Sequence, residues 1–112
     1  MTDITIEDFL KIDIRIGTIT DAKDFPQARK PAYQLWIDFG ADIGIKKTSA
    51  QITQNYEKEA LIGRQIAAVV NFPPRQIGKF MSEVLVLGFP DDSDNVTLIN
   101  ADKPVPNGAR LY

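Results

Sequence analysis

The side chains that most often perform catalysis are missing from this chain, which contains no histidine and no cysteine. Without imidazole there is no general base that titrates near neutral pH, and neither a Ser–His nor a Cys–His nucleophile pair can form. The same absences remove the usual ligands of zinc and exclude disulfides. Carboxylate or lysine chemistry would remain for an enzyme, but the sequence offers no recognisable nucleophile–base pair. We therefore predict a protein that is not an enzyme, with no catalytic residues, no metal site and no cofactor.

Three aspartates lie close together in the turn-like stretch 90–95, which reads PDDSDN. Asp91, Asp92 and Asp94 supply the carboxylate oxygens that calcium prefers. However, the stretch lacks both the spacing of an EF-hand loop and its closing glutamate. We therefore interpret it as a solvated acidic loop.

Binding chemistry is concentrated in residues 69–88, where two apolar runs bracket a basic segment. The pair Pro73-Pro74 stiffens the start of this segment, because proline fixes φ and donates no hydrogen bond. Arg75 and Lys79 follow four residues apart, with Phe80 beside the second. Two cations and an aromatic ring on a stiff connection between buried strands indicate a binding surface. The alternative is that the two cations only solubilise the connection.

The distribution of charge supports the binding interpretation. Residues 25–80 contain eight basic and four acidic side chains, a net charge of +4, whereas the rest of the chain carries five basic and eleven acidic side chains, a net charge of −6. A basic middle between acidic ends indicates one face suited to an anionic or polar partner.

The length of 112 residues allows one domain with one core, so we predict a single domain over residues 1–112. No run of about 18 apolar residues occurs, and the first residues are acidic where a signal peptide needs a basic flank. We therefore expect a cytoplasmic protein that does not insert into a membrane.

The elements that position the basic segment can be predicted from periodicity. Apolar and polar residues alternate over 12–22 and 33–40, which predicts half-buried strands, and Gly17 in the first of them indicates a bulge. Further strands are expected over 43–52, 66–72, 84–87 and 96–99. Short helices are expected from Thr5 and from Thr53 to Leu61. This order predicts an all-β fold with short helices, a five-stranded Greek-key barrel of the OB-fold type with an N-terminal helix and a C-terminal extension.

Some apolar residues have two interpretations that the sequence leaves open. Phe9 and Leu10 of the first helix either dock on the barrel or contact a second subunit, and the same alternatives hold for the tail that ends in Leu111-Tyr112. Trp36 falls on the polar side of its strand, where it either covers a barrel end or forms a stacking platform. The loop 25–32 is either solvated or in contact with a ligand.

The chain also resembles a known family over nearly its whole length. The stretches that carry the resemblance are FLKIDIRIGTI at 9–19, FPQARKPAYQLWIDFG at 25–40, TSAQIT at 48–53, LIGRQIAAVVNFPPRQIGKFMSEVLVLG at 61–88 and PVPNGARLY at 104–112. They are similar to the CsaA branch of the tRNA-binding-domain family, which comprises small export-related chaperones. The resemblance implies an OB-fold and a homodimer formed through the terminal segments. It also implies binding of unfolded or presequence-bearing polypeptides and, for the wider family, of tRNA by its shape.

The family's binding signature resembles N-[LF]-x-P-[RK]-x-[IL]-x-G-x-x-S-x-G-M. The positions of this chain that match it are Asn71, Phe72, Pro74, Arg75, Ile77 and Ser82. Lys79 and Val84 replace glycines of the tRNA binders and Leu85 replaces their methionine, so SEVLVLG resembles the CsaA version. The peptide- or tRNA-binding residues that we predict are Lys46, Lys47, Ser49, Asn71, Phe72, Arg75, Lys79, Phe80 and Ser82. Phe72 and Phe80 would anchor an extended peptide, and tRNA binding by the same basic face is the alternative function.

Overall fold

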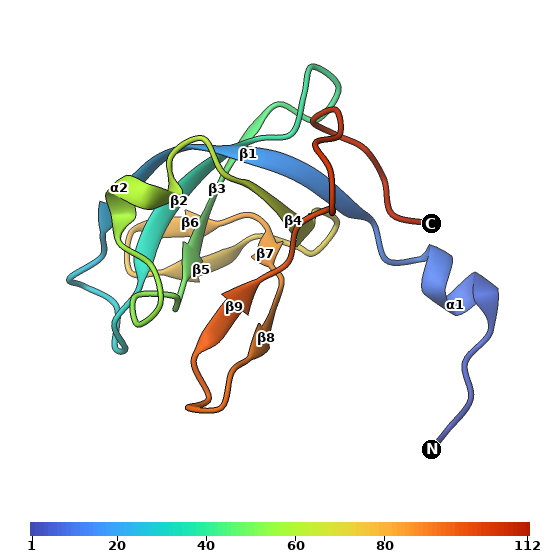
Figure 1. The fold of residues 1–112 in the computed structure, drawn as a ribbon, viewed down its shortest axis with the longest axis horizontal. Helices are drawn as coiled ribbons and strands as arrows, with labels where there is room; N and C mark the ends of the chain where they lie inside the picture. The colour runs from blue at the N-terminus through green and yellow to red at the C-terminus, as the bar shows by residue number, and fades with distance from the viewer.

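Five antiparallel strands form a strongly curved sheet that nearly closes into a barrel in the computed structural model, which describes residues 1–112 (Figure 1). The strands, in their order across the sheet, are β3 (Ile45–Ala50), β2 (Tyr33–Asp38), β1 (Ile14–Asp24), β4 (Gln65–Val69) and β7 (Leu85–Val86). This architecture confirms the predicted all-β fold and is consistent with an OB-fold.

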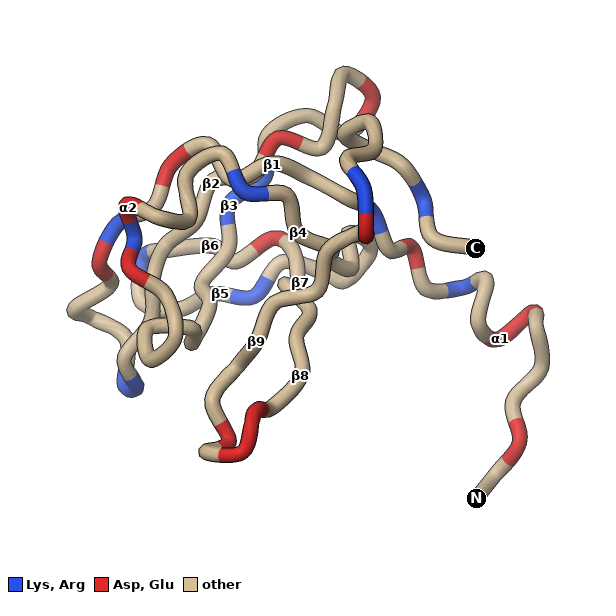
Figure 2. Tube along the Cα trace, in the orientation of Figure 1, with Lys and Arg blue, Asp and Glu red and all other residues tan.

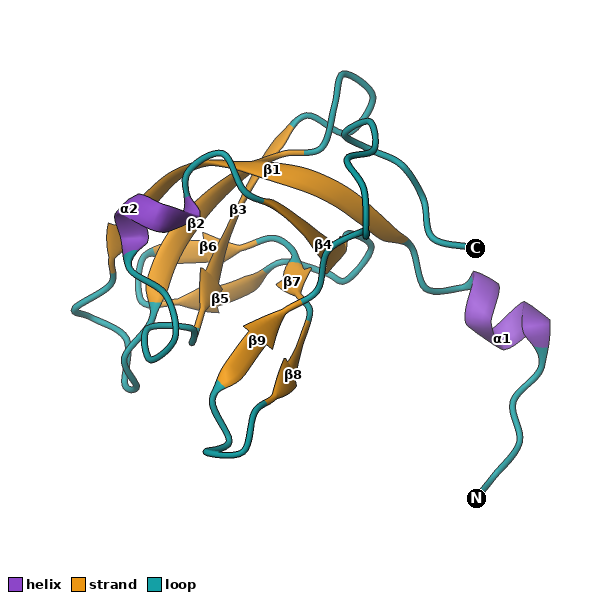
Figure 3. Cartoon of the chain, viewed as in Figure 1, coloured by secondary structure: helices purple, strands orange, loops and turns teal.

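Two short hairpins and two short helices complete the chain (Figure 3). The remaining elements are the hairpin β5 (Arg75–Ile77) and β6 (Phe80–Ser82), the hairpin β8 (Gly88–Pro90) and β9 (Val96–Leu98), and the helices α1 (Ile6–Leu10) and α2 (Lys58–Leu61). The sequence analysis did not predict the β5–β6 hairpin. Its turn uses Gly78 at a φ of 61°, a conformation that costs little without a side chain.

The core follows the alternation that the sequence displays. In β2 every second residue is buried, and Leu35 and Ile37 are completely inaccessible to solvent. Ile19 of the neighbouring strand β1 and Ile66 of β4, the next strand along, belong to the same core cluster. A strand turns successive side chains to opposite faces, so this alternation directs one face of the sheet into the barrel.

The predicted bulge lies at a different position. Gly17 pairs regularly with Ile66, whereas the register with β2 shifts between Ile19 and Asp21. Gly17 is required for close packing instead, because a Cβ atom there would lie 2.7 Å from the Phe39 ring. Gly17 therefore allows the Phe39 side chain to pack closely against the main chain of β1. The bulge lies at residue 20 instead, and it bends β1 there.

Two predicted boundaries are also wrong. The helix expected from Thr53 begins at Lys58, after the N-cap Glu57, and a turn occupies residues 53–55. This turn is fixed because Asn55 donates hydrogen bonds to the Asp91 carboxylate and to the Val96 carbonyl. The strand expected over 66–72 ends at Val69.

The N-terminal helix α1 stands away from the barrel (Figure 1). Thr5 and Asp8 form a capping box, in which each side chain accepts a hydrogen bond from the other residue's main-chain N–H. No residue of α1 is buried, and Ile6 and Leu10 are exposed. Packing on the barrel, one of the two interpretations of this helix, is therefore not its arrangement within one chain.

No helix of the structure has the length and apolar character needed to cross a membrane.

The C-terminal tail packs along the first half of β1, as one of the two interpretations predicted. Gly108 donates to the Ile16 carbonyl over 2.7 Å, and Leu111 donates to the Ile14 carbonyl over 2.9 Å. Arg110 reaches from the tail to the Leu10 carbonyl, at the end of α1, over 2.9 Å. The two termini are thus held next to each other, while the side chain of Tyr112 remains fully exposed.

Candidate functional site

The barrel has a seam between β3 and β7, the two strands at the ends of the sheet order. A chain of side-chain hydrogen bonds crosses it. The N–H of Ser49 donates to Ser82 Oγ over 3.1 Å, Ser82 Oγ lies 2.9 Å from Thr48 Oγ1, and Thr48 Oγ1 donates to the Val84 carbonyl over 2.7 Å. The Thr48 proton goes to this carbonyl, so the Ser82 hydroxyl donates to Thr48. These side chains, together with the main-chain hydrogen bond from the Glu83 N–H to the Lys47 carbonyl over 2.8 Å, join β3 to residues 82–84, which lead into β7.

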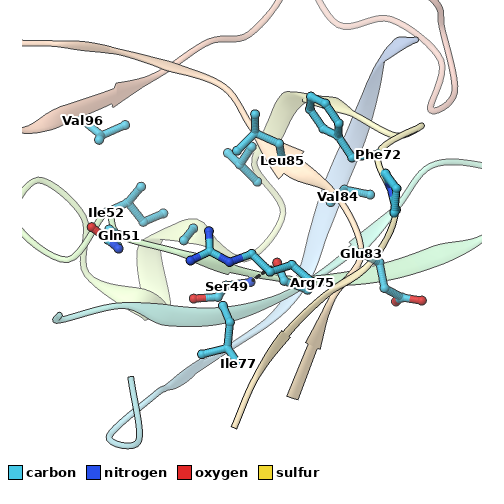
Figure 4. A pocket seen from close by; sticks show the side chains of 14 residues that line it. Ser49, Gln51, Ile52, Phe72, Arg75, Ile77, Glu83, Val84, Leu85 and Val96 are labelled. Atoms are coloured by element: carbon cyan, nitrogen blue, oxygen red, sulfur yellow. Dashed lines mark hydrogen bonds between the residues drawn. The ribbon is translucent and has the colours of Figure 1, made fainter. Parts of the chain in front are cut away.

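A groove of about 580 Å³ opens beside this seam (Figure 4). Eight of its lining residues are hydrophobic, among them Ile52, Val84 and Val86, which belong to the core or pack against it. Phe72 is about half exposed and lies at the edge of the groove. The groove thus combines an apolar floor with an accessible aromatic ring, which is the usual composition of a ligand site.

Arg75 supplies the positive charge of this groove. Figure 4 shows its side chain extended across the groove above Ser49, toward Gln51. The guanidinium forms no ion pair and no hydrogen bond. Glu83, the one acid of the lining, points away from it and accepts a hydrogen bond from the N–H of Lys47 over 3.0 Å. An unpaired guanidinium over an apolar floor can recognise a carboxylate or a phosphate.

Phe80 lies on another surface, in an aromatic cluster with Phe25 and Trp36. Its ring centroid is 5.3 Å from that of Phe25 and 6.1 Å from that of Trp36. The Lys47 ammonium lies 5.2 Å from the Phe80 ring, and the Lys23 ammonium 5.0 Å from the Trp36 ring. These contacts pack the β5–β6 hairpin against the barrel, so the cluster supports the hairpin that carries Arg75.

The nine predicted site residues therefore fall into separate places. Those that line the groove are Ser49, Phe72, Arg75 and Ser82. Asn71 instead holds the N-terminal arm, because it donates to the Lys11 carbonyl over 2.7 Å and accepts from the Asp13 N–H over 3.0 Å. The residues that do not line the groove are Lys46, Lys47, Asn71, Lys79 and Phe80. Figure 2 shows basic residues beside β3 and β5, and acidic ones at the tip of the β8–β9 hairpin.

The sequence analysis missed several lining residues, namely Gln51, Ile52, Glu83, Val86 and Val96. The apolar ones carried no distinguishing signal, because a valine on a groove floor and a valine in the core produce the same strand pattern. Gln51 stands two residues after Ser49 and therefore on the same side of the strand, and this spacing was the one available clue.

The acidic turn 90–95 is organised by Asp91. Its carboxylate accepts hydrogen bonds from Asn55 Nδ2 and from the N–H groups of Ser93 and Asn95, each over 2.9 Å. The bond from Asn55 and those from the main chain lower the pKa of Asp91. This carboxylate therefore fixes the shape of the turn between β8 and β9.

Comparison with known proteins gives the family of this chain. Residues 14–110 match the model of a family described as a putative tRNA binding domain. The structure is similar to that of the chaperone CsaA from Bacillus anthracis, with 50% identity, a TM-score of 0.92 and coverage of 99% of this chain and 100% of the other. It is also similar to the CsaA chaperone protein from Picrophilus torridus, with 53% identity, a TM-score of 0.91 and coverage of 98% and 100%. These similarities confirm the resemblance inferred from the sequence.

A longer class of relatives shares this segment. The methionine–tRNA ligase of Thermococcus onnurineus is 33% identical over 108 residues, which are 96% of this chain and 14% of the ligase. The chain thus spans about one seventh of the length of that relative.

Proposed function

This chain belongs to the family of putative tRNA-binding domains, and from that premise we propose that it is a non-enzymatic chaperone of the CsaA type. In this proposal it binds unfolded or export-bound polypeptides in the cytoplasm, and it does so as a homodimer. The observation that carries the proposal is the groove, in which the exposed Phe72 and the unpaired Arg75 flank an apolar floor. The two CsaA chaperones that align over full length support the same assignment.

The groove suits an extended, partly apolar peptide. Its volume of about 580 Å³ admits a few side chains, and its apolar floor gains free energy when it is removed from water. Aromatic residues at the edge of a pocket commonly carry a large share of binding energy, so Phe72 is the expected anchor.

The homodimer is supported by apolar surface at the termini. The N-terminal arm is held by polar contacts from Asn71 and Arg110, but it leaves apolar side chains exposed, namely those of Ile4, Ile6, Leu10 and Ile12. A second hollow of about 380 Å³ lies between the tail and the start of β1, lined mostly by apolar residues that include Ile14 and Leu111. A second copy would cover the arm and the hollow in one symmetric contact.

The test of peptide binding uses a fluorescently labelled unfolded peptide and measures its anisotropy with purified protein. We expect Phe72→Ala to weaken binding about tenfold, because it removes the aromatic edge of the groove. Phe89→Ala is the matched control, since Phe89 is similarly exposed but does not line the groove. Equal affinities of the two variants would contradict the assignment of the groove.

The test of the dimer is the mass in solution, measured by light scattering after size exclusion. The wild-type protein should have twice the chain mass, and Leu10→Ser should shift it toward the monomer at micromolar concentration. A wild-type mass equal to that of one chain would refute the homodimer.

Binding of tRNA is the second candidate function, which the family match favours, together with four predicted binding residues that are cations without an ion-pair partner. These cations are Lys46, Lys47, Arg75 and Lys79. Phosphate contacts release counterions, so tRNA binding would weaken steeply as salt rises. Bulk tRNA should displace the labelled peptide at low salt and fail to do so at physiological salt. Displacement that persists at physiological salt would make tRNA the primary ligand.

A further inference from the structure

We propose that the groove selects extended peptide segments in which an acidic side chain stands next to a large apolar one. This inference rests on the proposed peptide-binding function and names the class of peptide. It follows from three features of the groove, namely the unpaired charge of Arg75, the apolar floor beside it and the unoccupied main-chain groups of Gln51.

The charge of the groove is unbalanced. Arg75 has no acidic partner, and the carboxylate of Glu83 is occupied by the N–H of Lys47 and turned away. A guanidinium can bind a carboxylate through two parallel hydrogen bonds. A bound acidic side chain would therefore complete a pair that the free protein leaves open, whereas a basic side chain would meet repulsion.

The apolar floor begins next to this guanidinium. Figure 4 shows the Arg75 side chain extending toward the side of the groove where Ile52 lies. Further apolar lining residues are Ile77 of the same hairpin, Val84, Val86 and Val96. A ligand whose carboxylate reaches Arg75 thus places its neighbouring side chain over apolar surface. Acidic and apolar groups must be adjacent in the ligand because they are adjacent in the groove.

The main chain of Gln51 provides a place for the peptide backbone. On the seam side of β3, the N–H of Lys47 donates to Glu83 and the N–H of Ser49 donates to Ser82. By the alternation of a strand, the next main-chain groups on this side are those of Gln51. They form no hydrogen bond within the chain, and Gln51 lines the groove. An extended peptide can add its own main chain at such an edge.

This selectivity has a consequence for which part of an exported chain binds. A secretory signal begins with a basic flank, which the charge of Arg75 disfavours. The groove would therefore bind acidic and apolar segments of the mature part of the polypeptide rather than the basic flank of its signal.

The experiment compares labelled peptides that are identical except for one residue beside a central leucine, which is aspartate, asparagine or lysine. Anisotropy titration should give tighter binding of the aspartate peptide than of the asparagine peptide by about tenfold, with the lysine peptide weakest. In Arg75→Gln the ratio of the aspartate and asparagine affinities should fall to about one. In Lys79→Gln the ratio should persist, because Lys79 carries the same charge on the same hairpin but does not line the groove.

The results that would refute the peptide selectivity differ from those that would refute the proposed function. Equal binding of the aspartate and asparagine peptides overturns this inference alone, as does a preference that survives in Arg75→Gln or disappears equally in Lys79→Gln. Failure of every peptide to bind overturns the proposed function as well. If Arg75→Gln abolishes binding of bulk tRNA but leaves the peptide ratio unchanged, Arg75 recognises phosphate and the inference is refuted. Unchanged unfolding midpoints of both variants exclude a folding defect as the cause.

Discussion

Replacing Thr48 by valine should open the seam of the barrel without changing the shape of the core. Thr48 is the only polar residue among the buried side chains, and its hydroxyl donates to the Val84 carbonyl over 2.7 Å. Valine has nearly the same volume but cannot donate. The substitution therefore removes the hydrogen bond between β3 and the start of β7 and leaves the carbonyl without this partner.

The magnitude can be worked from this geometry. Loss of a hydrogen bond costs about 1 kcal/mol, and an unsatisfied buried carbonyl raises the cost to about 1–3 kcal/mol. The added methyl group returns a fraction of a kcal/mol of hydrophobic stabilisation. We expect a net loss of about 2 kcal/mol, which corresponds to a decrease in melting temperature of about 8 °C for a domain of this size.

The assay is urea unfolding followed by circular dichroism, with Thr97→Val as the control. Thr97 occupies an exposed position of β9, and its hydroxyl forms no hydrogen bond within the chain. We expect Thr97→Val to stay within about 0.5 kcal/mol of the wild type. If the two variants were equally stable, the hydrogen bonds across the seam would not hold the strands together. A destabilised Thr48→Val should also bind peptide more weakly, because the groove lies beside the seam.

Three further perturbations test other contacts of the fold. Gly17→Ala should destabilise by about 2 kcal/mol, because its methyl group would lie 2.7 Å from the Phe39 ring, and unchanged urea unfolding would refute this tight contact. Arg15 donates to the Asp13 carboxylate and lowers the pKa of Asp13, so this ion pair stabilises the fold above pH ~4 and is lost as the pH falls through the lowered value. Asp13→Asn should therefore be less stable than the wild type at neutral pH but not near pH ~2, and a difference independent of pH would contradict the linkage. Asn71→Ala should accelerate amide hydrogen exchange over residues 5–13 while β4 stays protected, and unchanged exchange there would show that Asn71 does not hold the arm.

The long strands could be predicted because local alternation reports burial directly. The pattern from Tyr33 to Asp38 places Leu35 and Ile37 in the core, and the structure shows the same assignment. The β5–β6 hairpin escaped prediction, because its strands have three residues each and the prolines before it suppressed a strand interpretation. Periodicity cannot be recognised in so short a segment.

The candidate site could be predicted in part, since the predicted residues that line the groove are Ser49, Phe72, Arg75 and Ser82. Arg75 was predicted as a cation directly after two prolines, and Phe72 and Ser82 were predicted from the family's binding signature. The places of Phe80 and Asn71 depend on contacts that are distant in the sequence. Phe80 packs on Phe25, which is 55 positions away, and Asn71 bonds to Asp13, which is 58 positions away. Such distant contacts leave no trace in local spacing, so a motif could name these two residues without revealing which surface each one occupies.

The position of Trp36 makes its intrinsic fluorescence a probe of the β5–β6 hairpin. It is the only tryptophan of the chain, and its ring meets Phe80 of the β5–β6 hairpin edge to face while the Lys23 ammonium lies above it. Its emission therefore responds to the docking of the hairpin that carries Arg75. A shift in emission wavelength that precedes the loss of circular dichroism would reveal a state in which the hairpin has detached from an intact barrel.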